Sequence, residues 1–393
     1  MKMSDRISEL TYAIRDIQVI ADKLKAQGHE ILQFNIGDPQ RFDYDVPNAI
    51  KDQLKSVLDE AYYSNSVGDI DVRQAIAKYE NDKNNLSIDP RDMIYFQGVS
   101  EGMLFSFLAF LNPGDRILVP GPAYPAYNSL GTVCQAEVIS YRCIEKENWI
   151  PDIDDIAAKL TPNTKLVVVI NPNNPTGSVY SEKVLREIRD IVGQSDAIII
   201  SDEIYDKLVI EGNYTPFSSL TKDVPMVVFN GFSKVYLVPG YRAAYGYIID
   251  KTDAIEQPWD GVRKLCRVRL SASTPISKAV IAALDQNPKH LPSLISKIKS
   301  RRDLVLKRFN EIDQIASTTP KAAFYIFPKI DLSATKFRDD KEFALSLLEE
   351  KQVLVVHGSG FGKEYGQNHF RMVYLAPEEV LEEGLTRIAD FLR

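Results

Sequence analysis

Short apolar runs alternate with segments of helical periodicity through the middle of the chain. MIYFQ at 93–97 precedes a helical stretch at 100–111, and RILVP at 116–120 begins the next such pair. The later runs are KLVVVI at 165–170, AIII at 197–200 and MVVF at 226–229. Strands that are apolar on both faces and separated by helices are typical of a parallel sheet covered on each side. The pattern therefore predicts an α/β fold with a mainly parallel, doubly covered sheet.

The pattern changes near Leu291, where a long segment of helical character leads into three more apolar runs. These are AFYIFPKI at 323–330, VLVVHG at 353–358 and FRMVYLA at 370–376. Pro377 and the two acidic residues after it favour a last helix that ends near Leu392. Because 393 residues exceed the size of one compact core, we expect two domains. The large one covers 46–285, and a smaller α+β domain combines 1–45 with 286–393.

Composition and charge argue against several classes of protein. The net charge of -7 and the pI near 5.4 speak against a nucleic-acid partner, since binding along a phosphate backbone needs a basic surface. The three cysteines and four histidines lack metal-ligand spacing, so we expect neither a metal site nor a disulfide framework. The N-terminus lacks an apolar core of signal-peptide length, and no run approaches the roughly 20 apolar residues of a membrane span. We expect a cytoplasmic protein.

Candidate chemistry lies where the predicted strands end, which is where open α/β sheets bind their ligands. The segments are GVSEG at 98–102, NPNNPTG at 171–177, SDEIYD at 201–206 and GFSK at 231–234. An enzyme that uses pyridoxal phosphate needs a lysine amine for the aldehyde, a carboxylate for the pyridine nitrogen and donors for the phosphate. The four segments together contain candidates for the lysine, the carboxylate and the phosphate donors.

Lys234 and Asp202 are the candidates for the lysine and the carboxylate. Lys234 follows a strand, in a setting where burial would lower its pKa and make the amine nucleophilic. Asp202 ends another apolar strand, where a buried carboxylate needs a cationic partner, and a pyridinium nitrogen would serve. Each residue taken singly has an ordinary alternative. Lys234 could be a solvated surface group, and Asp202 could cap a helix that begins at Glu203.

Two further side chains could reach the phenolic oxygen of the cofactor. Tyr205 would lie one helical turn beyond Asp202, and Asn174 could donate from the other side. Asparagine beside proline and glycine is also ordinary turn chemistry, so that alternative stays open.

The phosphate could bind at the start of a predicted helix. Val99 and Ser100 open this helix with free N–H groups, and Gly98 would let the backbone approach an anion closely. Ser233 and Arg242 can add a hydroxyl and a guanidinium fork. A capped helix without a ligand is the alternative for this segment.

Taken together, these residues resemble the class I and II aminotransferases of the fold-type I pyridoxal-phosphate enzymes, over essentially the whole chain. The family pattern is Asn-Pro-x-Asn-Pro-Thr-Gly, a strand that ends in Asp with Tyr three residues later, and Ser-Lys followed by Gly-x-Arg. It appears here as NPNNPTG, SDEIY, SK and PGYR. The resemblance implies Lys234 as the Schiff-base lysine and Asp202 as the pyridinium partner. It further implies Tyr205 and Asn174 on the phenolic oxygen, and Ser233, Arg242 and the Val99 and Ser100 amides on the phosphate.

The resemblance also assigns four positions outside these segments. Tyr124 in PAYPAY matches the aromatic residue that stacks on the cofactor ring. Tyr63 matches the tyrosine that reaches the phosphate of the neighbouring subunit, which implies a homodimer with shared active sites. Gly37 and Arg371 match the contacts to the substrate carboxylate. A buried arginine without an anion is costly, so a carboxylate is expected at Arg371, although a protein Asp or Glu could supply it.

Within this family the chain resembles microbial alanine aminotransferases, through NIGDP, GPAYPAY, WIPDIDDIAAKL and FYIFPKI. This implies amino transfer between alanine and 2-oxoglutarate, with an aspartate or broad-specificity aminotransferase as the runner-up. TYAIRD at 11–16 would then fold over the site, where Tyr12 would narrow the pocket and Arg15 would meet the distal carboxylate of glutamate. A surface helix is the alternative for both residues. The sequence departs from the family at Gly102, where alanine is usual, and at His357, where proline is common.

Other functions fit the residues less well. A nicotinamide dehydrogenase should show Gly-x-Gly-x-x-Gly after its first strand, and none appears. A transcription regulator built on such a domain would need a DNA-binding module, for which the about thirty-five residues before Gly37 leave no room. A carbon–sulfur lyase or a cyclising lyase of the same fold would use the same lysine and aspartate, so that alternative stays open.

Overall fold

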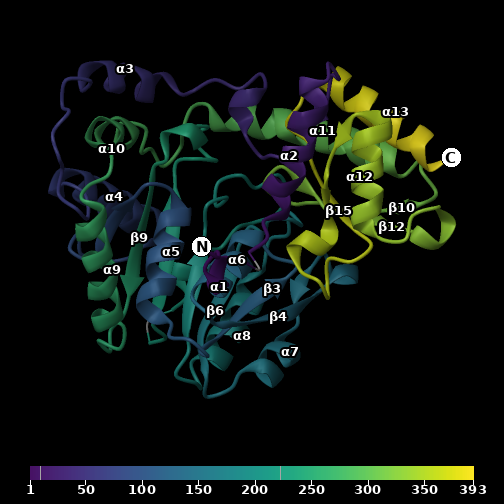
Figure 1. The fold of residues 1–393 in the computed structure, drawn as a ribbon. Helices are drawn as coiled ribbons and strands as arrows, with labels where there is room; N and C mark the ends of the chain where they lie inside the picture. Colours follow the sequence, from purple (N-terminus) through teal and green to yellow (C-terminus); the bar gives the residue numbers. More distant parts are fainter. Residues whose placement is uncertain (9, 222) are drawn as a thin grey trace.

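The computed structural model describes residues 1–8, 10–221 and 223–393. Its main feature is an eight-stranded sheet with the strand order β2-β9-β8-β7-β6-β3-β4-β5 (Figure 1). The strands are β2 (Met93–Phe96), β3 (Arg116–Gly121), β4 (Glu137–Ile144), β5 (Ile150–Pro151), β6 (Thr164–Ile170), β7 (Ile198–Asp202), β8 (Met226–Gly231) and β9 (Ala244–Ile249). The five neighbouring strands β8, β7, β6, β3 and β4 run parallel to one another. Strand β9 is antiparallel to both its neighbours, and β5 is antiparallel to β4.

Both faces of this sheet are buried, because successive residues of its central strands enter two different cores. In β6, Val167 and Val169 belong to one core, while Leu166 and Val168 belong to the other. Helices α5, α6 and α9 cover the second core, and α4 and α8 contribute to the first. The prediction of a mainly parallel, doubly covered α/β sheet is therefore confirmed.

Helices occupy several of the connections between the strands and parts of the chain before and after the sheet. They are α1 (Asp5–Ser8), α2 (Ala13–Ala26), α3 (Asn48–Ser56), α4 (Ile70–Asn84), α5 (Val99–Phe110), α6 (Pro125–Val133), α7 (Ile153–Lys159), α8 (Glu182–Val192), α9 (Glu256–Arg269), α10 (Thr274–Ile281), α11 (Leu291–Phe309), α12 (Asp340–Lys351) and α13 (Glu378–Leu392). The predicted C-terminal helix is present, with Pro377 immediately before its first residue.

The C-terminal part of the chain carries three small sheets packed with α11, α12 and α13. The pairs are β1 (Leu32–Gln33) with β13 (Val353–Leu354), and β10 (Ile315–Ala316) with β12 (Lys329–Ile330). The third sheet has the order β11 (Tyr325–Ile326), β15 (Phe370–Val373) and β14 (Val356–His357). Helix α2, purple in Figure 1, packs against α12 and β14 of this part. The domain boundaries at 45/46 and 285/286 stay a prediction.

The cysteines, the helices and the possible metal ligands bear on the classes of protein that the composition argued against. The three cysteines, Cys134, Cys143 and Cys266, are buried and free. Within the described residues, no helix has the length and apolar character that crossing a membrane requires. The same part of the chain contains no group of three or more His, Cys, Asp or Glu side chains placed to hold a metal ion.

Candidate active site

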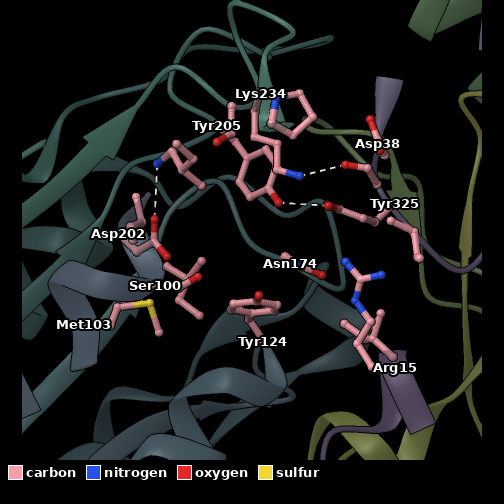
Figure 2. A pocket seen from close by; sticks show the side chains of 18 of the residues that line it. Arg15, Asp38, Ser100, Met103, Tyr124, Asn174, Asp202, Tyr205, Lys234 and Tyr325 are labelled. Atoms are coloured by element: carbon pink, nitrogen blue, oxygen red, sulfur yellow. Dashed lines mark hydrogen bonds between the residues drawn. The ribbon is translucent and has the colours of Figure 1, made fainter. Parts of the chain in front are cut away.

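A cavity of about 510 Å³ lies where β6 and β7 end and where the chain leaves β8 towards Lys234. Every residue that the sequence singled out for the site lines this cavity, with the exception of Tyr63. These residues are Tyr12, Arg15, Gly37, Val99, Ser100, Tyr124, Asn174, Asp202, Tyr205, Ser233, Lys234, Arg242 and Arg371. Figure 2 shows Lys234 and Tyr205 on one side of the cavity, Tyr124 and Asn174 on the other, and Arg15 at its edge.

Lys234 extends its amine into the cavity from the segment after β8. Its Nζ donates a hydrogen bond to the carbonyl oxygen of Gly37 at 2.7 Å. Burial, assisted by the positive charge of Arg371, lowers the pKa of Lys234 to about 8. More of the amine is therefore neutral at neutral pH than in an ordinary lysine, and this fraction can act as a nucleophile or a base.

Asp202 ends β7 with a carboxylate that is only 4% exposed. The Tyr127 hydroxyl donates to its Oδ2 at 2.9 Å, and the Ile204 N–H donates to its Oδ1 at 3.3 Å. Burial raises the pKa of Asp202 to about 6, against the opposing effect of these two donors. No ion pair to Asp202 is formed within the described residues. The carboxylate is thus placed to receive a cationic group of a ligand.

The segment after Asp202 differs from the sequence prediction. No helix begins at Glu203; residues 204–207 form a turn, so the helix-cap alternative for Asp202 is wrong. The chain makes a single turn, in which the Asp206 N–H donates to the Glu203 carbonyl at 3.0 Å, and it then pairs with a distant segment, because the Ala323 N–H donates to the Leu208 carbonyl at 2.8 Å. Tyr205 nevertheless reaches the cavity, where its hydroxyl lies 2.9 Å from the hydroxyl of Tyr325.

The start of α5 offers open donors to an anion. The helix begins at Val99, preceded by Gly98 with a φ of 87°. A Cβ on Gly98 would lie 2.2 Å from Nη2 of Arg242, so only glycine allows this guanidinium to pack against the first turn. The amides of the first turn and Arg242 together form a positively polarised end of the cavity, close to Ser233.

Arg371 is a buried cation without a carboxylate. It lies in β15 and is 1% exposed. Its Nη1 donates to Oδ1 of Asn174 at 2.9 Å, and its Nη2 donates to the carbonyl oxygen of Asn35. Its Nε has no hydrogen-bond partner, and no Asp or Glu within the described residues pairs with it. The alternative of a protein carboxylate is therefore wrong, and the guanidinium is free to pair with an anionic ligand.

Tyr12 and Arg15 come from the N-terminal segment and line the same cavity, Tyr12 from just before α2 and Arg15 as an exposed residue of that helix. The Tyr12 hydroxyl lies 2.7 Å from the hydroxyl of Tyr124, with the two rings edge to face. The Ser129 hydroxyl donates to the Thr11 carbonyl at 2.8 Å and fastens the same segment to α6. Arg15 projects from α2 towards the cavity (Figure 2). Their roles in substrate choice stay a prediction.

Tyr63 lies outside the cavity and is 82% exposed. Other exposed apolar residues are Leu58 and Tyr62 before it in the chain, and Val268 and Leu270 at the end of α9. The segment that carries Tyr63 lies beside the region between α9 and α10, because hydrogen bonds join the two. The bonds run from the Thr274 hydroxyl to the Tyr62 carbonyl and from the Ser64 hydroxyl to the Ala272 carbonyl. A single chain therefore does not bring Tyr63 to the site.

The residues that the sequence prediction missed include Tyr127, which lies behind Asp202, and Tyr325, which lines the cavity. Tyr127 holds Asp202, and Tyr325 contacts Tyr205. A signal existed for Tyr127, which follows Tyr124 by three residues and so shares its side of α6. None existed for Tyr325, because a tyrosine within the apolar run 323–330 looks like an ordinary core residue.

Comparison with known proteins agrees with this geometry. The model of the family "Aminotransferase class I and II" matches residues 29–388. The glutamate-pyruvate aminotransferase AlaA of Haemophilus influenzae is 36% identical over 99% of this chain and 97% of its own. The solved structure of an alanine aminotransferase from Pyrococcus furiosus superposes with a TM-score of 0.96 at 44% identity, covering 100% of this chain and 99% of that one. Aspartate aminotransferase from Thermus thermophilus with maleate gives 0.90 at 26% identity, with both chains fully covered.

Proposed function

The chain belongs to the class I and II aminotransferases, and we propose that it uses pyridoxal phosphate to exchange amino groups between alanine and 2-oxoglutarate. The observation that carries the proposal is Arg371, a buried cation without a protein carboxylate in the same cavity as Lys234 and Asp202. An amino acid and a 2-oxo acid both present an α-carboxylate that fits it. The choice of alanine is supported by relatives named alanine and glutamate-pyruvate aminotransferases.

The residues present fit pyridoxal phosphate. Lys234 would carry the cofactor covalently, and Asp202 would pair with the pyridine nitrogen. Tyr205 and Asn174 would hold the phenolic oxygen, and Tyr124 would stack on the ring. The phosphate would lie at the start of α5, held by Val99, Ser100, Ser233 and Arg242. When bound, the cofactor supplies an electron sink for the negative charge that develops at the substrate α-carbon.

The protein's own groups then orient the substrate and move its proton. Arg371 binds the α-carboxylate, and Asn174 fixes the guanidinium by accepting from its Nη1. Lys234, with a pKa of about 8, takes the proton from the α-carbon through its neutral amine. The Gly37 carbonyl holds Nζ at 2.7 Å, and the Tyr12–Tyr124 pair narrows the access of water to the reacting atoms.

A panel of half-reactions tests this function. The holoenzyme is mixed with single amino acids without an acceptor, and the visible absorbance of the lysine-bound cofactor is followed. Alanine and glutamate should each discharge the absorbance and yield pyruvate and 2-oxoglutarate in single-turnover amounts. Faster discharge by aspartate would favour the runner-up, an aspartate or broad-specificity aminotransferase. Repeated pyruvate release without an acceptor from a substrate with a β-sulfur would instead favour a carbon–sulfur lyase.

Replacing Arg15 should affect the half-reaction with glutamate more than the half-reaction with alanine. Its guanidinium projects towards the cavity from α2, where it could meet the distal carboxylate of glutamate, a group that alanine lacks. Replacing it by alanine should slow the glutamate half-reaction by about 10-fold to 100-fold, as expected for a lost charge-assisted hydrogen bond, and leave the alanine half-reaction nearly unchanged. Stopped-flow absorbance with each amino acid measures both rates. Equal losses, or none, would remove Arg15 from substrate recognition.

We propose further that two copies of the chain form a homodimer with shared active sites. The exposed apolar side chains of Tyr62 and Tyr63, and of Leu270 near the neighbouring segment, support this, since large exposed apolar residues that lie near one another mark an interaction site. Tyr63 would then reach into the site of a second copy of this chain, where its hydroxyl would donate a hydrogen bond to the cofactor phosphate. The cytoplasmic location expected from the sequence stays a prediction.

Subunit mixing tests the shared site. An inactive Lys234→Ala chain mixed with an impaired Tyr63→Phe chain should regain activity, because one site of each mixed dimer then has both native residues. At full exchange, about a quarter of the sites are intact by simple counting of random pairing. Exchange is verified by mass spectrometry of tagged chains. Verified exchange without any gain would show that Tyr63 does not act across the subunit boundary.

A further inference from the structure

Tyr325 contacts three groups of the site from a single buried position. It is 2% exposed, and its hydroxyl lies 2.9 Å from that of Tyr205 (Figure 2). The guanidinium carbon of Arg371 lies 4.7 Å from the centre of its ring. A Cβ on Gly37 would lie 2.3 Å from its hydroxyl oxygen, so glycine is needed there to admit it. Tyr325 thus touches both the cofactor side and the carboxylate side of the cavity.

The position of Tyr325 is fixed by strand pairing and not by the cavity itself. It lies in β11, opposite Val373 of β15, and Arg371 lies two residues earlier along β15. Tyr205 lies on the turn after β7, which belongs to the large sheet. The two hydroxyls therefore join the C-terminal sheet to the large sheet at the site.

The two ends of the Tyr325 side chain act on the site in different ways. Burial raises the pKa of Tyr325 to about 12 and raises that of Tyr205, so both groups are neutral hydroxyls able to donate. When Tyr205 donates to a ligand oxygen, it must accept from Tyr325, and this second bond makes Tyr205 a stronger donor. The ring face of Tyr325 stabilises the Arg371 cation by a cation–π contact.

We propose that Tyr325 is a positioning residue that couples the two halves of the site, through its hydroxyl to Tyr205 and through its ring to Arg371. The inference rests on the proposed function, since it takes Tyr205 to bind the phenolic oxygen of the cofactor and Arg371 to bind the substrate carboxylate. The hydroxyl and the ring can be removed separately by Tyr325→Phe and Tyr325→Leu.

The Tyr325→Phe variant should change the titration of the bound cofactor. With its second hydrogen bond lost, Tyr205 donates less strongly to the phenolic oxygen and stabilises its ionised form less. The pH midpoint of the visible absorbance of the lysine-bound cofactor should therefore rise by about 0.5 to 1 pH unit, the size expected for one hydrogen bond. The KM for alanine should change little, because the ring remains over Arg371.

The Tyr325→Leu variant should additionally weaken substrate binding. Loss of the ring removes one of two cation–π contacts of Arg371 and leaves the other, to Phe361 at 4.8 Å, so the KM for every amino acid should rise by about 3-fold to 30-fold. Tyr374→Phe is the matched control. Tyr374 is another fully buried tyrosine near the same strands, but its hydroxyl bonds weakly to the Ala323 carbonyl at 3.4 Å and does not line the cavity.

The holoenzymes of the three variants and the native chain are titrated, and thermal unfolding of the cofactor-free proteins reports on folding. A midpoint shift in Tyr325→Phe that Tyr374→Phe lacks, together with a KM rise only in Tyr325→Leu, supports the inference. An unshifted midpoint in Tyr325→Phe, or equal KM changes in both Tyr325 variants, overturns it and leaves the proposed function intact. If the native chain acquires no visible absorbance with pyridoxal phosphate, both proposals fail.

Discussion

Replacing Lys234 by alanine should abolish turnover while the fold is retained. The side chain makes one polar contact, to the Gly37 carbonyl, and its pKa of about 8 makes it the base of the cavity. A methyl group can neither hold the cofactor covalently nor take the α-proton. We expect kcat for alanine and 2-oxoglutarate to fall by on the order of 10⁴-fold, the upper end of what one positioned base contributes.

Steady-state assays measure this loss, and circular dichroism with thermal unfolding checks the fold. Lys264→Ala is a suitable control, because Lys264 is an exposed lysine on α9 that pairs with Asp260 and does not line the cavity. The control should keep native activity. Turnover of the Lys234 variant within tenfold of the native rate would contradict its assignment as the reacting lysine.

Replacing Asp202 by asparagine should cause the second largest loss. Asparagine keeps an oxygen for the Tyr127 hydroxyl, which lies 2.9 Å from the native carboxylate, so the local structure should persist. The negative charge that keeps the pyridine nitrogen protonated is lost, however, and the α-carbon charge is stabilised less. We expect kcat to fall by about 10²-fold to 10³-fold, or about 3 to 4 kcal/mol in the barrier.

Rapid-mixing measurement of the alanine half-reaction isolates this step from product release. The absorbance of the bound cofactor and its dissociation constant show whether the variant still binds it. Slow chemistry with the cofactor retained supports the role of Asp202. An unchanged half-reaction would show that Asp202 serves only to anchor the turn that carries Tyr205.

Five strands of the sheet, β2, β3, β6, β7 and β8, could be predicted because each contains an uninterrupted apolar run. Leu166 and Val167 are both buried although they face opposite sides, and a short run with this property is typical of a strand covered on both faces. The short turn after Asp202 could not be predicted, since the chain leaves it to pair with Lys321 and Ala323, which lie far along the chain. Local sequence cannot show a partner that lies far along the chain.

The site also contains residues that the sequence could reveal and residues that it could not. Lys234 and Asp202 stand out because a charged residue at the end of an apolar strand is unusual. Tyr325 resembles any core tyrosine in sequence, and its importance follows only from its distances to Tyr205 and Arg371. That Arg371 lacks a protein carboxylate is likewise a property of the folded chain.

Chemical trapping shows most directly whether Lys234 holds pyridoxal phosphate, on which the proposed function depends. The holoenzyme is reduced with borohydride and digested, and its peptides are sequenced by mass spectrometry. We expect a pyridoxyl group on Lys234 in close to stoichiometric yield, and none after prior incubation with excess alanine, which would free the lysine. A pyridoxyl group on another lysine, or no incorporation into protein that has been saturated with the cofactor, would contradict the assignment of Lys234.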